Sequence, residues 1–147
     1  MTGNGLFEDR GIRFSYPDGW RVEVTDEGAV TTVALHSVAG PSFALVQLDG
    51  DCTDPSEVAE GALEAMREEY PDLDATPARD TISGHAAVGH DVEFFSLDIT
   101  STCAIRCFRT DRRTVLLFGQ WPDLEEEEAL SVLHAVRDSF EETDDGD

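Results

Sequence analysis

The segment GIRFSYPDGW, at residues 11–20, says most about the fold of this protein. Apolar and polar side chains alternate through IRFSY, and this period of two predicts a β-strand with one buried face. The PDG that follows predicts a turn, because proline presets its φ angle and glycine accepts conformations that other residues avoid. We interpret Phe14, Tyr16 and Trp20 as core residues, with an aromatic binding site as the alternative.

Three more alternating segments follow this turn: WRVEV, AVTTVAL and SFALVQL. Because only short turns separate them, the N-terminal third predicts an antiparallel meander of four strands that starts with IRFSY. Later strands are predicted from DATPARDTI, AAVGHDVEF, DITSTCAIRCFR and TVLLFGQW. The last of these is almost entirely apolar, which is typical of a strand that is buried on both faces.

Two segments have the helical period instead. DPSEVAEGALEAMREEYP begins with Asp54 as an N-cap and Pro55 in the first helical position, and Pro71 ends it. In PDLEEEEALSVLHAVRDSF, apolar residues recur at helical spacing from Ala129 to Phe140. The order of elements predicts an α+β protein, with an antiparallel β-sheet and helices packed on its faces.

The charge of the chain is strongly acidic. It has 32 Asp and Glu residues against 10 basic residues, all arginine, and a net charge of −22. Repulsion on this scale destabilises a compact state unless salt screens it, so we interpret the chain as salt-adapted and halophilic. The alternative is a GC-rich genome that favours arginine codons. Either origin disfavours binding to nucleic acid, since phosphate contacts require a basic surface.

The 147 residues suit one domain, which we place at residues 1–140, followed by an acidic tail at 141–147 that we expect to be disordered. No apolar run approaches the ~20 residues that cross a bilayer, so no membrane partner is expected. The N-terminal residues also lack the pattern of a secretory signal. The expected location is therefore the cytoplasm.

The sequence predicts no catalytic, metal-binding or cofactor-binding residues. Cys103 and Cys107 lie about 13 Å apart if they share one strand, too far for a common metal ion or a disulfide, so we interpret both as core residues. His85 and His90 have odd spacing and are expected on opposite strand faces. No phosphate-binding loop or nucleophile motif is present. An enzyme is therefore the less favoured class, and no cofactor is predicted.

One group of basic residues interrupts the acidic sequence. Arg106, Arg109, Arg112 and Arg113 are expected to cluster at a hairpin tip, where they form a candidate binding site for an acidic partner. The alternative is that these arginines form ion pairs within the chain, with the acids at residues 125–128.

The motif FSYPDGW, the order of the predicted elements and the final VRDSF together resemble the PsbP/DcrB-like family. That superfamily includes the PsbP subunit of photosystem II, bacterial DcrB-type proteins and a Ran-binding nuclear-import factor of yeast. The resemblance implies a PsbP-like α/β/α sandwich. No functional residue of the family matches a motif of this chain. The residues that carry the resemblance are Phe14, Tyr16, Pro17, Gly19, Trp20, Ser139 and Phe140.

Two functions follow as hypotheses. The first is a non-catalytic binding or adaptor module, whose partner is unknown and could be another protein. The alternative is a small-ligand carrier or an enzyme with a pocket between sheet and helix. A filled core would favour the first hypothesis. A polar cavity that holds Cys52 or a histidine beside several carboxylates would favour the second. The oligomeric state stays open.

Overall fold

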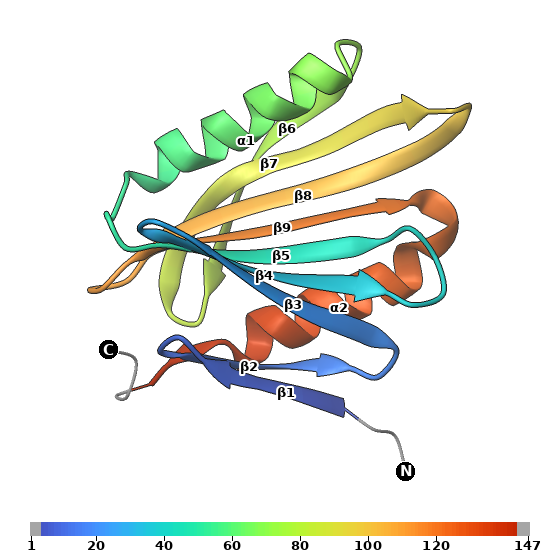
Figure 1. The fold of residues 1–147 in the computed structure, drawn as a ribbon. Coiled ribbons are helices and arrows are strands. Elements are labelled where there is room, and N and C mark those ends of the chain that lie inside the picture. The colour runs from blue at the N-terminus through green and yellow to red at the C-terminus, as the bar shows by residue number, and fades with distance from the viewer. Residues whose placement is uncertain (1–3, 144–147) are drawn as a thin grey trace.

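The computed structural model describes residues 4–143. Within this range the chain forms ten β-strands and two α-helices, in an α+β arrangement of antiparallel sheets with a helix on each side of the larger one (Figure 1). The predicted fold class is therefore confirmed. No helix in the described range is both long enough and apolar enough to cross a membrane.

The larger sheet has seven antiparallel strands in the order β3-β4-β5-β9-β8-β7-β6. Its first three strands are three of the four strands of the predicted meander, and β9 lies beside β5 at the centre. The strands are β3 (Trp20–Glu27), β4 (Val30–Ser37), β5 (Phe43–Asp49), β6 (Asp74–Ile82), β7 (His85–Ser96), β8 (Ile99–Arg109) and β9 (Thr114–Pro122).

A second sheet corrects the prediction for the N-terminal segment. IRFSYP forms β2 (Ile12–Pro17), which pairs with β1 (Asn4–Asp9) and β10 (Glu141–Glu142) instead of with β3. Gly19, in the turn between β2 and β3, has a φ of +92°, which glycine adopts without strain. The two strands lie in different sheets on either side of this predicted PDG turn. Packing decides the pairing, because β2 buries Phe14 completely against the core that α2 shares with the larger sheet.

The C-terminal boundary also differs from the expectation of a disordered tail at residues 141–147. Glu141 and Glu142 pair with Arg13 and Ile12 of β2, so the segment begins as an ordered strand. The backbone N–H of Thr143 then donates to the carbonyl oxygen of Gly11. Strand pairing satisfies backbone groups regardless of side-chain charge, which is why an acidic segment can form β10. The rest of the expected tail lies outside the described residues.

The first helix, α1 (Pro55–Glu69), packs on β7, β8 and β9 from one side of the larger sheet. The Asp54 side chain caps it by accepting a hydrogen bond from the Ser56 N–H at 2.8 Å, and Pro55 occupies the first turn as predicted. Ala59, Leu63 and Met66 are its buried residues, and they enclose a core with Cys103, Ile105 and Cys107 of β8.

The second helix, α2 (Glu126–Ser139), lies on the opposite side of the larger sheet and also contacts β2 (Figure 1). A short 3-10 helix, Asp123–Glu125, leads into it. Ala129, Val132 and Val136 are buried, as the periodicity predicts. They share a core with Phe14, which is stacked on Phe7 and lies beside Tyr16, while Tyr16 and Trp20 are partly buried. The core interpretation of the aromatic residues is therefore confirmed.

Candidate ligand-binding cleft

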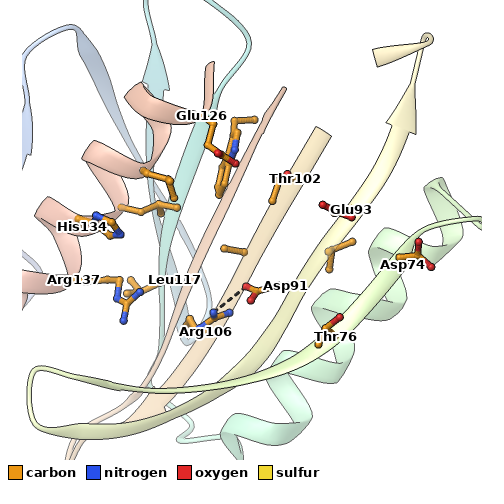
Figure 2. Close-up of a pocket in the computed structure, with 15 residues that line it drawn as sticks. Asp74, Thr76, Asp91, Glu93, Thr102, Arg106, Leu117, Glu126, His134 and Arg137 are labelled. Carbon is orange, nitrogen blue, oxygen red and sulfur yellow. Dashed lines mark ion pairs between the residues drawn. The ribbon is translucent and has the colours of Figure 1, made fainter. Parts of the chain in front are cut away.

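A cleft of about 570 Å³ lies between α2 and strands β6 to β9 (Figure 2). It lies on the α2 side of the larger sheet, on the face opposite α1, and its wall residues come from both the sheet and the helix. The side chains that define its chemistry are Asp74, Thr76, Asp91, Glu93, Thr102, Ala104, Arg106, Leu117, Trp121, Glu126, Leu130, Leu133, His134 and Arg137.

The register of the strands explains how the sheet side of the cleft is built. Trp121 pairs with Thr102, Thr102 with Glu93, and Glu93 with Asp74, so these four residues form one row across β9, β8, β7 and β6. Residues paired across a sheet project from the same face. The row therefore runs from a buried indole near the centre of the sheet to exposed carboxylates at its edge.

The neighbouring row has two small residues on β9 and β8, which leave space above the sheet. Gly119 pairs with Ala104, which pairs with Asp91. A Cβ atom at Gly119 would lie 2.8 Å from the Leu133 side chain, so the absence of a side chain there lets α2 approach β9 closely. Ala104 fills little of the space between β8 and the helix. As a result α2 covers the centre of the sheet but leaves the β6–β8 side open.

Arg106 forms an ion-pair network at one end of the cleft. Its Nε donates to Asp80 Oδ2 at 2.6 Å, and its Nη2 lies 2.9 Å from Asp91 Oδ1. Its Nη1 donates to the carbonyl oxygens of His90 and Ile105. Almost all of the donor capacity of this guanidinium is therefore used within the protein.

Arg137, from α2, joins the same network, because its Nη2 lies 3.4 Å from Asp80 Oδ1. The hydrogen bond from Arg106 holds the pKa of Asp80 below its ordinary value of 3.8, against the opposing effect of burial, and the charge of Arg137 lowers it further. Burial acts to lower the pKa of Arg106, but the hydrogen bonds that Arg106 donates to Asp80 and Asp91 outweigh it and raise that pKa. Both arginines are thus neutralised by the protein itself.

The other ionisable groups of the cleft are free of such pairing. Asp74, Glu93 and Glu126 make no ion pair with any residue in the range 4–143. Figure 2 shows Glu126 on the helix side of the cleft, with Glu93 and Asp74 on the sheet side. His134 also lies on the helix wall. The opening of the cleft therefore carries excess negative charge.

Trp121 is the least solvated polar group of the cleft. The residue is 3 % exposed, and its indole Nε1 has no hydrogen-bond partner in the part of the chain that the structure describes. A buried N–H without a partner costs about 1–3 kcal/mol, so such groups are uncommon in folded proteins. Where one occurs, a bound ligand is one source of the missing acceptor. The cleft thus combines an apolar base, an unused donor and a carboxylate rim.

The fold has counterparts among solved structures. The sequence matches no known family profile, and no curated protein is similar to it in sequence. The cyanobacterial PsbP protein CyanoP from Synechocystis sp. PCC 6803 superposes with a TM-score of 0.64 at 13 % identity, over 97 % of this chain and 94 % of that chain. The fold is PsbP-like.

A second PsbP-like neighbour is LpqN, a protein involved in cell envelope biogenesis of Mycobacterium tuberculosis. It superposes with a TM-score of 0.61 at 16 % identity and covers 97 % of this chain and 91 % of that chain. Identities this low relate the chains through their fold. The predicted PsbP-like architecture is thus confirmed along nearly the whole length of the protein.

In this PsbP-like fold the four arginines predicted as a binding cluster are separated. Arg106 lies in the cleft, away from the hairpin tip. Arg113 is 9 % exposed, forms an ion pair with Glu142 at 3.0 Å and donates to the carbonyl oxygen of Arg10. Only Arg109 and Arg112 are exposed at the β8–β9 turn.

The acids that pair with these arginines also differ from the expected ones at residues 125–128. Glu125 accepts hydrogen bonds from Ser42, and Glu126 lines the cleft. The actual partners, Asp80, Asp91 and Glu142, are distant in sequence and are brought close by the sheet and by β10. Sequence proximity alone could not identify them.

The cysteines and histidines lie where their spacing predicts. All three cysteines are free, and Cys103 and Cys107 are buried beneath α1. Burial raises the pKa of Cys107 to about 12, and burial, with a contribution from the charge of Asp91, raises that of Cys103. His90 contacts Glu60 of α1 at 2.9 Å, while His85 stacks on Phe108 in the core on the other side. No metal-binding group of three or more such residues occurs within 4–143.

Sequence reasoning missed the cleft because its residues look ordinary one strand at a time. Asp91, Glu93 and Thr102 occupy the polar positions of alternating strands, which normally face solvent. TVLLFGQW has the pattern of a strand that is buried on both faces, and this pattern does not single out Trp121. The available signal was Gly119, a glycine within an otherwise apolar strand, because such a glycine often marks a close approach of another element.

Proposed function

We propose that this protein is a non-catalytic binding module that holds a small molecule in the cleft between α2 and the β6–β9 face. The observation that carries the proposal is the buried Trp121, whose indole N–H lacks a partner within residues 4–143 at the base of an open cavity. A ligand with an acceptor atom would satisfy this donor, which the folded chain leaves unsatisfied at a cost in free energy.

The size and lining of the cleft support a small molecule. Its volume of about 570 Å³ lies within the range of about 300–1,000 Å³ that is usual for ligand pockets. Its apolar base consists of Ala104, Leu117, Leu130 and Leu133, with polar groups around it. A histidine, His134, lines the same cavity as several carboxylates, which is the arrangement expected of a ligand carrier or enzyme and not of a filled core. Within residues 4–143 no serine, cysteine or lysine lines the cleft, so we propose binding and not catalysis.

The test uses Trp121 as its own reporter. The chain has two tryptophans, so Trp20→Phe leaves a single indole in the cleft. We expect members of a fragment library to shift the Trp121 indole ¹H–¹⁵N NMR signal of this variant. The same fragments should leave that signal unchanged when Ala104→Phe is added, since the new ring fills the space above β8. Shifts that persist in the filled variant, or no shift with any fragment, would refute the proposal.

We also propose that the chain is related to the DcrB-type proteins and acts in a salt-rich cytoplasm. The PsbP-like fold and the FSYPDGW motif support the relationship. The net charge of −22 with no lysine supports salt adaptation. The dependence of thermal stability on salt concentration tests the proposed salt adaptation.

A second candidate function is contact with an acidic protein surface through Arg109 and Arg112, supported by their exposure at the β8–β9 turn. A photo-crosslinking residue at position 109 should capture a protein partner in cells of the source organism. The matched control is position 68 on the exposed side of α1, where Glu68 lies. Equal capture from both positions, or none from 109, would exclude this contact.

A further inference from the structure

The charge distribution of the cleft points to the chemical class of its ligand. We propose that the cleft binds a small organic cation, with its ammonium group beside Asp74 and Glu93 at the rim and its apolar body against Trp121. This inference rests on the proposed function and adds the chemistry of the ligand. It starts from the imbalance of charge between the two ends of the cleft.

The positive groups of the cleft are already compensated. Arg106 is held by Asp80 at 2.6 Å and Asp91 at 2.9 Å, and Arg137 lies 3.4 Å from Asp80. These contacts place two arginines against two aspartates. An anionic ligand would therefore have to displace an aspartate from the Arg106 guanidinium, which is 13 % exposed. Breaking that largely buried ion pair costs more free energy than the new ion pair provides.

The negative groups are not compensated in the same way. Asp74 and Glu93 are paired with each other across β6 and β7, so two like charges stand side by side at the rim. Glu126, at the start of α2, lines the same cleft from the helix side (Figure 2). Like charges directly opposite in a sheet are destabilising, and a bound cation would relieve that repulsion. None of the three carboxylates makes an ion pair within the described residues.

The base of the cleft defines the rest of the ligand. Trp121 lies in the same row as Glu93, separated from it by Thr102 on β8. Two strand spacings of about 4.8 Å place the indole roughly 10 Å from Glu93, and Asp74 lies one strand further. A molecule with an ammonium group at one end, a short apolar body and an acceptor oxygen at the other end spans this distance. Its oxygen would accept the Nε1–H of Trp121, and apolar contacts would come from Leu130 and Leu133.

A matched series of three probes tests the inference. Tyramine, 4-hydroxyphenylethanol and 4-hydroxyphenylacetate share one phenol body and end in an ammonium, a hydroxyl and a carboxylate. Dissociation constants are measured from the Trp121 indole signal of Trp20→Phe, at the lowest salt concentration that keeps the protein fully folded. We expect tyramine to bind about ten-fold more tightly than the neutral alcohol, and the carboxylate to bind most weakly.

Substitutions separate a local contact from the effect of overall charge. Glu93→Gln with Glu126→Gln should weaken tyramine binding about ten-fold and leave the alcohol unchanged. Glu57→Gln with Glu68→Gln makes the same change in net charge on α1, on the far side of the sheet, and should leave both constants unchanged. Melting curves of each variant establish that it is folded.

The outcomes distinguish the two proposals. If the alcohol or the carboxylate binds as well as tyramine, and Ala104→Phe abolishes that binding, the cleft is a ligand site but the cation assignment is wrong. The assignment is also wrong if both double variants weaken tyramine binding equally, because bulk charge then explains the affinity. If no probe and no library fragment binds in the cleft, both proposals are wrong.

Discussion

Arg106 on β8 donates from Nε to Asp80 Oδ2 on β6 at 2.6 Å, although the whole width of β7 separates the two strands. The residue of β7 that pairs with Arg106 is Gly89, which has no side chain to obstruct the crossing. The Arg106 Nη1 group also donates to the carbonyl oxygen of His90 on the intervening strand β7. One side chain therefore ties three strands together at the end of the cleft, and α2 is joined to them through Arg137.

The pairing of Asp80 predicts a dependence of stability on pH. The pKa of Asp80 in the folded protein is lowered below 3.8, so its pairing stabilises the fold above that pH and is lost as the pH falls through the folded value. Asp80→Asn should therefore lower the free energy of unfolding by about 1–3 kcal/mol at neutral pH. The loss should shrink in acid, as measured by urea unfolding across the pH range. Asp72→Asn, at an exposed aspartate, is the control, and equal stability of the two variants at neutral pH would contradict the prediction.

Arg113 contributes to the stability of the fold, whereas its neighbour Arg112 contributes little, and alanine substitutions should show this difference. Arg113→Ala removes the ion pair to Glu142 and the hydrogen bond to the Arg10 carbonyl oxygen, and leaves a half-buried carboxylate unpaired. We expect it to cost about 3 kcal/mol in urea unfolding. Arg112→Ala loses one exposed hydrogen bond to the Thr143 carbonyl oxygen and should change stability by less than about 1 kcal/mol. Similar losses from both substitutions would contradict the assignment.

The thiols should differ sharply in reactivity. Burial raises the pKa values of Cys103 and Cys107, the latter to about 12, so almost no thiolate forms at either residue near neutral pH. Cys52 is partly exposed in the loop after β5. An alkylating reagent should label Cys52 first, and Cys52→Ser should resist labelling until urea is added. Mass spectrometry of the native protein measures this, and rapid labelling of either β8 cysteine would show that the α1 core opens readily.

Salt should stabilise the protein. The acidic side chains repel one another across the surface, and salt screens this repulsion, so the melting temperature should rise markedly from low to molar KCl. Sucrose serves as the control, because it favours the compact state without screening charge. A melting temperature that is flat in KCl, or that rises equally in sucrose, would count against salt adaptation.

The local elements of the fold could be predicted because short-range physics determines them. Asp54 and Pro55 mark the start of α1, and the spacing from Ala129 to Val136 defines the buried side of α2. Alternation in β8 placed Cys103 and Cys107 on one buried face. In each case the residues that decide the structure lie within one or two turns, or within one strand, of each other.

The partners of those elements were decided by the tertiary structure. Periodicity shows that one face of β2 is buried, but not that α2 would bury it and separate it from β3. The cleft has the same origin. Asp91 and Arg106 resemble solvent-facing residues in sequence and become its wall only when β7 pairs with β8 and α2 packs across β9. Alternation encodes which side of a strand avoids water, whereas the choice of what covers that side depends on packing summed over residues far apart in the chain.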